Sequence, residues 1–257
     1  MSRYALRFGA LAYLALLLLA PVGLVFWRTF EHGFGPAWDS VTTPEARHAL
    51  WLTLEIAAIA VPANAIFGLV AAIAIVRHRF RGAGLVNALV DLPLALSPVV
   101  VGLSLLLLYG TGGWLAGHGV LFALPAMTLA TIFVSLPFVV REVVPVLREV
   151  GTEQEQAAAT LGASRLQTFR RVTWPAIRWA TGYGVVLTTA RALGEFGAVS
   201  VVSGRLAGET ETLTLHVQER YETFDATGAY AAAVVLALIA LATLLLMNRL
   251  EPREETR

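Results

Sequence analysis

The sequence predicts an all-α, polytopic membrane protein with six transmembrane helices. Of its 257 residues, 57% are hydrophobic and only 14% are charged, whereas about a quarter of the residues in a typical soluble domain are charged. Apolar stretches that are long enough to cross a hydrocarbon core of about 30 Å recur along the whole chain. The predicted spans are residues 8–27, 50–76, 85–109, 120–140, 179–202 and 228–247.

The first span, 8–27, follows Arg3 and Arg7 and is long enough to cross the bilayer. A cleaved signal peptide is the alternative, but the apolar core of such a peptide usually has about 7–15 residues, so we expect a retained anchor. With the polar loop that follows, this span forms a predicted N-terminal unit of residues 1–48. The second span opens the predicted core, 49–249.

The third span, 85–109, contains Pro93, Ser97 and Pro98. Proline removes a helical hydrogen bond, so we expect a kinked or broken helix here. The backbone groups that a break frees must face protein or water inside a membrane, and in transporters such breaks lie near the substrate. Ser97 and Pro98 are therefore candidate residues of a translocation path or gate, with a kink that serves packing alone as the alternative.

A polar and basic loop follows the fourth span, and its core of residues 151–178 predicts two short helices. Thr152 with Glu155 has the Ser/Thr-x-x-Glu/Gln spacing of a capping box, in which two side chains cap the start of a helix. Ser164 with Gln167 has the same spacing. The sequence therefore predicts that a new helix begins at each of these two places.

The turn between these two helices is predicted at Gly162, where the first helix would end in a left-handed cap. Pro175 either stops the second helix or begins the next one at its first position. A compact projection of this kind suits docking into the groove of a partner protein. An ordinary polar loop with helix caps is the alternative.

The fifth span, 179–202, contains Arg191 and Glu195, which lie one helical turn apart and should share a helix face. Ionisable residues within a membrane are costly and usually face the bundle interior or an aqueous path. We expect Arg191 beside an anion path or gate, with Glu195 tempering its charge; a structural pair that neutralises itself is the alternative. Ser203 belongs to the same run of small residues, which allow helices to approach closely, and is a further candidate for the path.

The arginines give the orientation of the spans. Four of them, Arg28, Arg47, Arg205 and Arg220, lie on one side of the predicted membrane, Arg191 lies in a span, and the other fourteen lie on the opposite side. Loops rich in positive charge stay in the cytoplasm. We therefore expect both termini, the tail of residues 250–257 and the 151–178 loop on the cytoplasmic side.

The composition also excludes several classes of function. The chain has no cysteine, which excludes disulfides and thiolate metal sites. It has no lysine either, so it lacks a Walker-type phosphate-binding loop and is not itself an ATPase. The five histidines are scattered without the spacing of metal ligands, and no G-x-S-x-G nucleophile motif occurs. We expect no catalytic residues, no metal, no cofactor and no nucleic-acid partner.

The 151–178 loop resembles the EAA loop of ABC-importer permeases, whose pattern is E-A-A, three residues, G, nine residues and I-x-L-P. The positions that carry this resemblance are Gln156, Ala157, Ala158, Gly162 and Pro175. The resemblance implies that this loop docks an ATPase subunit. Gln156 replaces the glutamate of the family pattern, and Glu155, one residue earlier, is expected to substitute for that glutamate in part.

Further stretches match over roughly two thirds of the chain, and they are DLPLALSPVVVG from Asp91, LPFVVRE from Leu136, AATLGAS from Ala158 and ARALGEFGAVSVVSG from Ala190. In these stretches the chain resembles the sulfate/thiosulfate permease subunits of the CysW type. The resemblance implies a type I ABC-importer fold in the lipid bilayer of a bacterial inner membrane, with sulfate or thiosulfate as the transported anion. It also implies a second, homologous permease subunit of the CysT type, two ATPase subunits of the CysA type and a periplasmic sulfate/thiosulfate-binding protein.

Three other functions stay open at this point. A molybdate or tungstate permease is the nearest, because the RALGEFG core also resembles molybdate permeases. An autonomous secondary anion transporter would need coupling carboxylates deep in the membrane, and only Glu195 qualifies. A membrane scaffold would suit the structured loop, but it would not explain an arginine within a span.

Overall fold

The computed structural model describes residues 3–78 and 81–250, and every regular element in these two ranges is helical. Residues 1–2, the predicted tail from residue 251 onward and Arg79 lie outside the described residues. In chain order the elements are α1 (Arg3–Phe30), α2 (Phe34–Val41), α3 (Pro44–Arg77), α4 (Ala83–Ala95), α5 (Pro98–Tyr109), α6 (Leu124–Ser135), α7 (Pro137–Val150), α8 (Glu153–Thr160), α9 (Arg165–Thr168), the π-helical turn η1 (Phe169–Thr173), α10 (Trp174–Leu193), α11 (Val199–Val202), α12 (Leu213–Glu222) and α13 (Ala226–Leu250).

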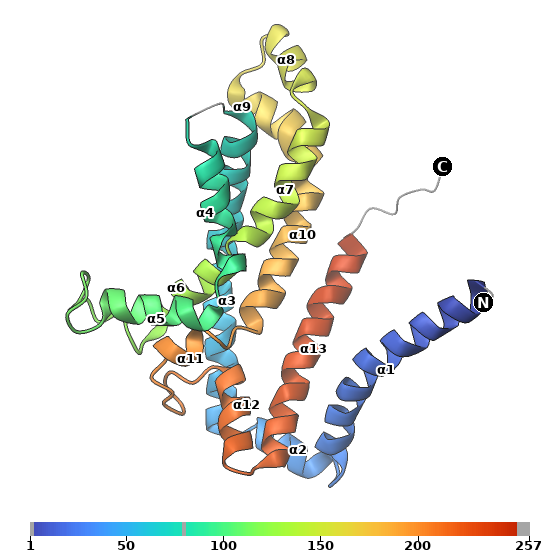
Figure 1. Cartoon of the computed structure of the whole chain (residues 1–257), viewed down its shortest axis with the longest axis vertical. Coiled ribbons are helices and arrows are strands. Elements are labelled where there is room, and N and C mark those ends of the chain that lie inside the picture. Colours follow the sequence, from blue (N-terminus) through green and yellow to red (C-terminus); the bar gives the residue numbers. More distant parts are fainter. Residues whose placement is uncertain (1–2, 79–80, 251–257) are drawn as a thin grey trace.

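The molecule is elongated, and its two ends carry different elements. Helices α8 and α9 project at one end of the long axis, whereas α2 and α12 lie at the other end (Figure 1). Between the ends, α3, α7, α10 and α13 run along the axis, and α10 packs against the other three. Helix α1 stands apart from this bundle over most of its length and contacts α2 and α13.

Each of the six predicted spans falls on a helical segment. Within the described residues, four segments are long and apolar enough to cross a membrane individually, and the pair α4 and α5 adds a fifth when it is counted as one bent span. The four segments are Arg7–Phe30, Pro44–Arg77, Leu124–Val150 and Ala226–Thr243. The remaining predicted span, the fifth, corresponds to α10, which has 20 residues.

The third predicted span is broken, as the prolines predicted. Helix α4 ends at Ala95, and α5 begins at Pro98 after a bend of 109°. Pro98 occupies the first turn of α5, where its missing N–H costs no helical hydrogen bond. Helix α5 therefore leaves the bundle sideways rather than continuing α4 (Figure 1).

The predicted boundaries of two spans are wrong. The fourth span, predicted at 120–140, begins at Leu124 and continues to Val150. The helix extends because valines and a leucine on one face of α7 stay buried beyond residue 140, and Leu147 is fully enclosed. The fifth, predicted at 179–202, runs from Trp174 to Leu193, since Pro175 starts the helix and Gly194 ends it.

The second span is continuous although Pro62 lies within it. Two residues after the proline, the buried amide of Asn64 donates hydrogen bonds to the Ile132 carbonyl at 3.0 Å and to the Ser135 hydroxyl at 2.8 Å. Polar side chains that bond across helices stabilise packing where lipid offers no hydrogen-bonding partner. This contact ties α3 to α6 at mid-length.

The core has two main apolar clusters along the axis. One joins α3, α5, α6, α11 and α12 around Met127 and Val199, and the other joins α3, α4, α7 and α10 around Leu147 and Ile177. In the second cluster, Val139 of α7 lies between two glycines. A Cβ atom on Gly68 of α3 would stand 2.6 Å from the Val139 Cβ, and one on Gly184 of α10 would stand 2.8 Å from the Val139 Cα.

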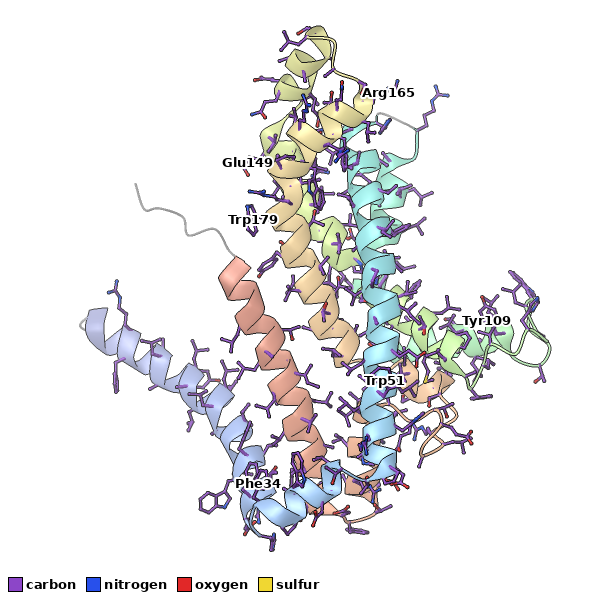
Figure 2. All side chains as sticks on the ribbon, turned by 180° about the vertical axis from the view of Figure 1, so that it is seen from behind. Phe34, Trp51, Tyr109, Glu149, Arg165 and Trp179 are labelled. Carbon is purple, nitrogen blue, oxygen red and sulfur yellow. The ribbon has the colours of Figure 1, made fainter. Side chains whose placement is uncertain are left out.

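Large apolar side chains cover the outside of the helices. Trp51 on α3 is 67% exposed, and Leu11 on α1 is 66% exposed. Figure 2 shows such side chains projecting outward, among them the labelled Phe34 and Trp179. Apolar exposure over the full length of several helices is typical of surfaces that face lipid or a partner subunit within the membrane.

Candidate functional site

Two regions contain the residues that the sequence singled out, apart from Ser203. The first is the projection at one end of the molecule, residues 151–175, which we call the tip. The second is the junction where α10 ends, α5 begins and α11 follows, which we call the hinge. Chain topology places the tip directly between α7 and α10, so the tip is covalently continuous with two helices of the bundle.

The turn of the tip is built around Gly162, as predicted. This residue has a φ of 82°, in the left-handed region. The N–H of Ala163 donates to the carbonyl of Ala158 and the N–H of Gly162 to that of Ala159, both at 3.0 Å. These two bonds form a Schellman motif, which ends a helix with a residue in left-handed geometry. The prediction of a left-handed cap is confirmed.

One of the two predicted capping boxes is present. The Ser164 hydroxyl accepts from the Gln167 N–H at 3.3 Å, and the Gln167 side chain accepts from the Ser164 N–H at 2.9 Å. The other prediction is wrong, because Thr152 makes no capping bond at the start of α8. Its hydroxyl accepts instead from the side-chain amide of Gln156, and Glu155 points toward the bundle.

The remaining predicted positions of the tip are also located. Ala157 and Ala158 lie on α8, and Gln156 on the same helix is exposed. Pro175 does not stop a helix; it occupies the first turn of α10, so the second of its two predicted roles is the observed one. The π-helical turn η1 leads into it, and the chain from α9 to α10 is helical without interruption.

The outer surface of the tip combines exposed apolar and basic side chains. Leu161, beside the turn, is 88% exposed, and Leu166 on α9 is 66% exposed. Arg165, Arg170 and Arg171 on the adjoining turns are exposed as well. A short helical projection with apolar residues at its end and cations around them matches the geometry of helix-in-groove recognition.

At the hinge, Arg191 and Glu195 form the predicted ion pair. The guanidinium Nη2 lies 2.7 Å from the carboxylate Oε2, with the side chain of Arg191 30% exposed and that of Glu195 1% exposed. The expectation that both residues share one helix face is wrong, since α10 ends at Leu193 and Glu195 follows the end of the helix. Arg191 reaches past the helix end to meet it.

Glu195 also holds neighbouring segments in place. Its second carboxylate oxygen accepts from the Ala198 N–H at 2.8 Å, directly before α11. Its backbone carbonyl accepts from the Thr214 hydroxyl on α12, also at 2.8 Å. The carboxylate therefore fixes the segment that leads into α11 while it balances the charge of Arg191, which favours a structural role for Glu195. Arg191, which is partly exposed, keeps donors that Glu195 does not use.

The broken span meets the same junction. A Cβ atom on Gly197 would stand 2.9 Å from the Cβ of Pro98, so the start of α5 packs directly against the residues between α10 and α11. Ser97 caps α5 by position, but its side chain makes no capping bond. The structure thus brings Pro98 close to the segment that carries Glu195.

Ser203 lies apart from these residues, at the far end of α11. Its hydroxyl donates to the Thr210 carbonyl at 2.6 Å and accepts from the Arg205 N–H at 3.0 Å. Both bonds close the loop that leads to α12. In this structure Ser203 is buried and fixes that loop, which favours a structural role.

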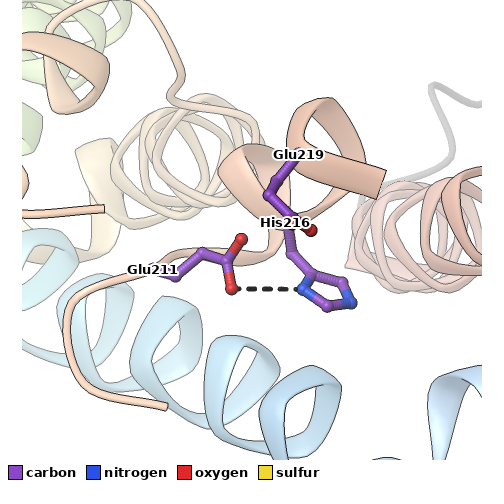
Figure 3. A group of neighbouring side chains, drawn as sticks. All are labelled: Glu211, His216 and Glu219. Atoms are coloured by element: carbon purple, nitrogen blue, oxygen red, sulfur yellow. Dashed lines mark hydrogen bonds and ion pairs between the residues drawn. The ribbon is translucent and has the colours of Figure 1, made fainter. Parts of the chain in front are cut away.

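A further polar cluster was not anticipated from the sequence. Glu211, His216 and Glu219 offer ligand atoms within 4.8 Å of one another on α12 and the loop before it (Figure 3). Buried Glu211 and buried His216 face each other at 3.2 Å, whereas Glu219 is exposed. The fold of the loop onto α12 creates this proximity, and histidine spacing along the chain gave no signal of it. The absence of a metal site stays a prediction.

The family described as "Binding-protein-dependent transport system inner membrane component" matches residues 64–256. The chain belongs to this family. As a permease of this kind, it is a non-catalytic membrane component of a transport system.

Individual permeases of the family are similar over nearly the full length. The sulfate transport system permease protein CysW of Synechocystis sp. is 49% identical, over 98% of this chain and 93% of its own. CysW of Escherichia coli K12 is 48% identical, over 95% of this chain and 86% of its own. The sulfate transport system permease protein CysT of Salmonella typhimurium is 39% identical, over 95% of this chain and 90% of its own.

Solved structures support the fold of the permease. A bacterial ABC transporter involved in the import of the acidic polysaccharide alginate matches with a TM-score of 0.79 at 18% identity, covering 99% of this chain and 96% of that chain. A bacterial alginate ABC transporter in complex with an alginate pentasaccharide-bound periplasmic protein matches with a TM-score of 0.80 at 18% identity, over 98% of this chain and 94% of that chain. The predicted all-α ABC-importer permease fold is confirmed.

Proposed function

We propose that the chain is the membrane-spanning permease subunit of an ATP-driven importer of sulfate and thiosulfate. The observation that carries this proposal is sequence identity of 48–49%, over nearly the whole chain, to permeases named for sulfate transport. The hinge is chemically consistent with it, since a guanidinium presents a fork of donors that suits oxyanions. Arg191 lies there with donors that are free to face a passing anion.

The proposed importer contains other subunits. The chain would pair with a homologous permease of the CysT type, to which it is also similar. Two ATPase subunits of the CysA type would supply ATP hydrolysis, one of them docked on the exposed leucines and arginines of the tip. A periplasmic sulfate/thiosulfate-binding protein would deliver the anion at the opposite end, where α2 and α12 lie.

We propose that the tip and both termini lie in the cytoplasm of a cell whose inner membrane holds the permease. The tip and the turn after α12 are at opposite ends of the long axis, so they should lie on opposite sides of the bilayer. Gln154 and Thr223 are exposed at these two places. The chain has no native cysteine, so single cysteines can report each side.

With a membrane-impermeant maleimide, Thr223→Cys is expected to react in intact spheroplasts. Gln154→Cys should react only after the inner membrane is permeabilised, because positively charged loops are retained in the cytoplasm. The measurement is the fraction of each variant that carries the label. Equal labelling of both cysteines in intact spheroplasts would contradict the proposed orientation.

The transported anion is tested by growth and uptake. A strain that lacks this gene is expected to lose growth on sulfate as the sole sulfur source and to regain it with the gene on a plasmid. Uptake of labelled sulfate should fall in parallel, and unlabelled thiosulfate should compete for it. Normal sulfate uptake together with lost molybdate uptake would instead assign the chain to a molybdate or tungstate permease.

A further inference from the structure

The cytoplasmic end of α3 is joined to the base of the tip by one arginine. Arg77 is the last residue of α3, and its guanidinium donates to the carbonyl of Leu147 at 3.0 Å and to that of Gly151 at 2.7 Å. Its Nε lies 3.2 Å and 3.1 Å from the two carboxylate oxygens of Glu155 on α8. All three guanidinium nitrogens therefore contact the end of α7 or the start of the tip.

Glu155 connects this arginine to the segment of the tip that leads into α10. The same carboxylate accepts from the hydroxyl of Thr173 at 2.8 Å, at the end of η1. The side chains of Arg77 and Glu155 are only 10% and 22% exposed, so water screens the pair weakly. Glu155 is thus engaged within the permease, and its expected substitution for the family's glutamate toward an ATPase does not fit this geometry.

The two covalent connections between the bundle and the tip are irregular. The connection from α7 passes through Gly151, which has a φ of 67° and ends the helix. The connection to α10 passes through the π-helical turn η1, which is wider and less regular than an α-helix. Each connection is a place where the tip could swivel relative to the bundle, since neither is a continuous α-helix.

Arg77 and Glu155 together restrain both irregular connections, the one at Gly151 and the one at η1. Arg77 holds Gly151 directly, and Glu155 holds Thr173 at the end of the π-helical turn. Helix α3 in turn packs along α6, α7, α10 and α12, so a displacement of its end reaches the whole bundle. A charged pair with several hydrogen bonds resists rotation better than the chain connections alone.

We propose that Arg77 and Glu155 form a positioning clamp that transmits movement of the tip to α3 during transport. The clamp does not contact the transported anion. It keeps the tip and the bundle moving as one body when the docked partner moves. This inference rests on the proposed function of the tip as the docking site of an ATPase.

The test uses the complete importer, purified and reconstituted in lipid vesicles with its binding protein. ATP hydrolysis is measured with and without sulfate-loaded binding protein, and sulfate uptake is measured in the same vesicles. In Arg77→Met the stem remains but every donor is lost. We expect the ATPase to co-purify at the wild-type level, basal hydrolysis to persist, and both stimulated hydrolysis and uptake to fall about tenfold, which corresponds to about 1.4 kcal/mol.

Three further variants separate the clamp from general destabilisation. Arg77→Lys keeps the charge and is expected to restore about a third of the coupling, because lysine cannot reach all acceptors. Glu155→Gln and Thr173→Val are close to isosteric, and each should reduce coupling about threefold even if Arg77→Met fails to accumulate. As a control, Arg141→Met breaks the more exposed ion pair between Arg141 and Asp91 of α4, and should leave coupling within twofold of the wild type.

The outcomes distinguish a failure of the clamp from a failure of the proposed function. If Arg77→Met shows wild-type stimulated hydrolysis and uptake, the clamp is refuted while the proposed function stands. If Arg77→Met does not accumulate, wild-type values for both Glu155→Gln and Thr173→Val refute the clamp in the same way. If the wild-type importer binds no ATPase or takes up no sulfate, the proposed function itself fails. If Arg141→Met loses as much coupling as the clamp variants, the effect is a general loss of packing and the clamp is refuted as well.

Discussion

Replacing Gly162 with valine is expected to detach or uncouple the ATPase while the membrane bundle stays assembled. Gly162 has a φ of 82°, and a Cβ atom there would meet no atom within 4 Å, so we expect the cost to lie in the backbone. A residue with a Cβ in left-handed geometry costs about 1–2 kcal/mol, and a β-branched one is especially disfavoured. The correctly turned tip should therefore be populated roughly fivefold to thirtyfold less.

Two control variants separate strain at the turn of the tip from backbone strain elsewhere in the chain. Gly162→Asn should retain most of the coupling, because asparagine tolerates left-handed geometry. Gly208→Val imposes the same backbone strain at a φ of 77° in an exposed loop away from the tip, and should not reduce ATPase co-purification. The measurements are co-purification of the ATPase and hydrolysis stimulated by loaded binding protein. Wild-type values for Gly162→Val in both would show that the tip is not the docking element.

The second large effect is expected at the hinge. Glu195→Leu leaves Arg191 without its counter-charge and the Ala198 N–H without its acceptor. Removing one partner of a fully buried ion pair typically costs about 3–5 kcal/mol. This is an upper bound here, because the side chain of Arg191 is 30% exposed. We therefore expect Glu195→Leu to fail to accumulate in the membrane. Single-variant loss of this kind does not separate a structural role from a transport role, so a paired variant is needed.

The paired variant is Arg191→Met with Glu195→Gln. Glutamine keeps an oxygen that can accept from the Ala198 N–H, and methionine fills the space of the arginine stem without its charge, so the protein should fold. A hydrogen bond to a charged group contributes about 1.5–3 kcal/mol, so sulfate uptake should fall about tenfold to a hundredfold if Arg191 serves the anion. Uptake near the wild-type rate by a stably expressed double variant would leave the pair as architecture.

The two capping boxes show what could be predicted from sequence. The side chains of Ser164 and Gln167 each bond to the backbone N–H of the other residue and to no distant group, so their spacing determined the outcome. Thr152 and Glu155 have the same spacing, but Glu155 is turned away by Arg77, which is 78 positions earlier in the chain. A local pattern decides the structure where no distant group competes for the same side chain.

The hinge illustrates the same limit. Pro98 predicted the broken span correctly, because a missing N–H acts locally. The end of α10 before Glu195 was missed, since the apolar run continues past Gly194 and hydropathy does not register where a helix ends. The contact of Pro98 with Gly197 depends on packing between segments that are far apart in the chain. The contact of Glu211 with His216 depends on a loop that folds back onto α12. No pattern along the chain encodes either of them.

The glycines on either side of Val139 restrict how the permease can change shape. Val139 of α7 fits against α3 at Gly68 and against α10 at Gly184, where neither helix has a side chain. If α7 slid along either helix by a fraction of a turn, the valine would leave these two positions and clash with the neighbouring residues. These three helices therefore cannot slide past one another and should move together as one rigid body. In the proposed importer, the conformational change should then occur outside these three helices, at α5, which leaves the bundle sideways, and at the contact with the proposed second permease subunit.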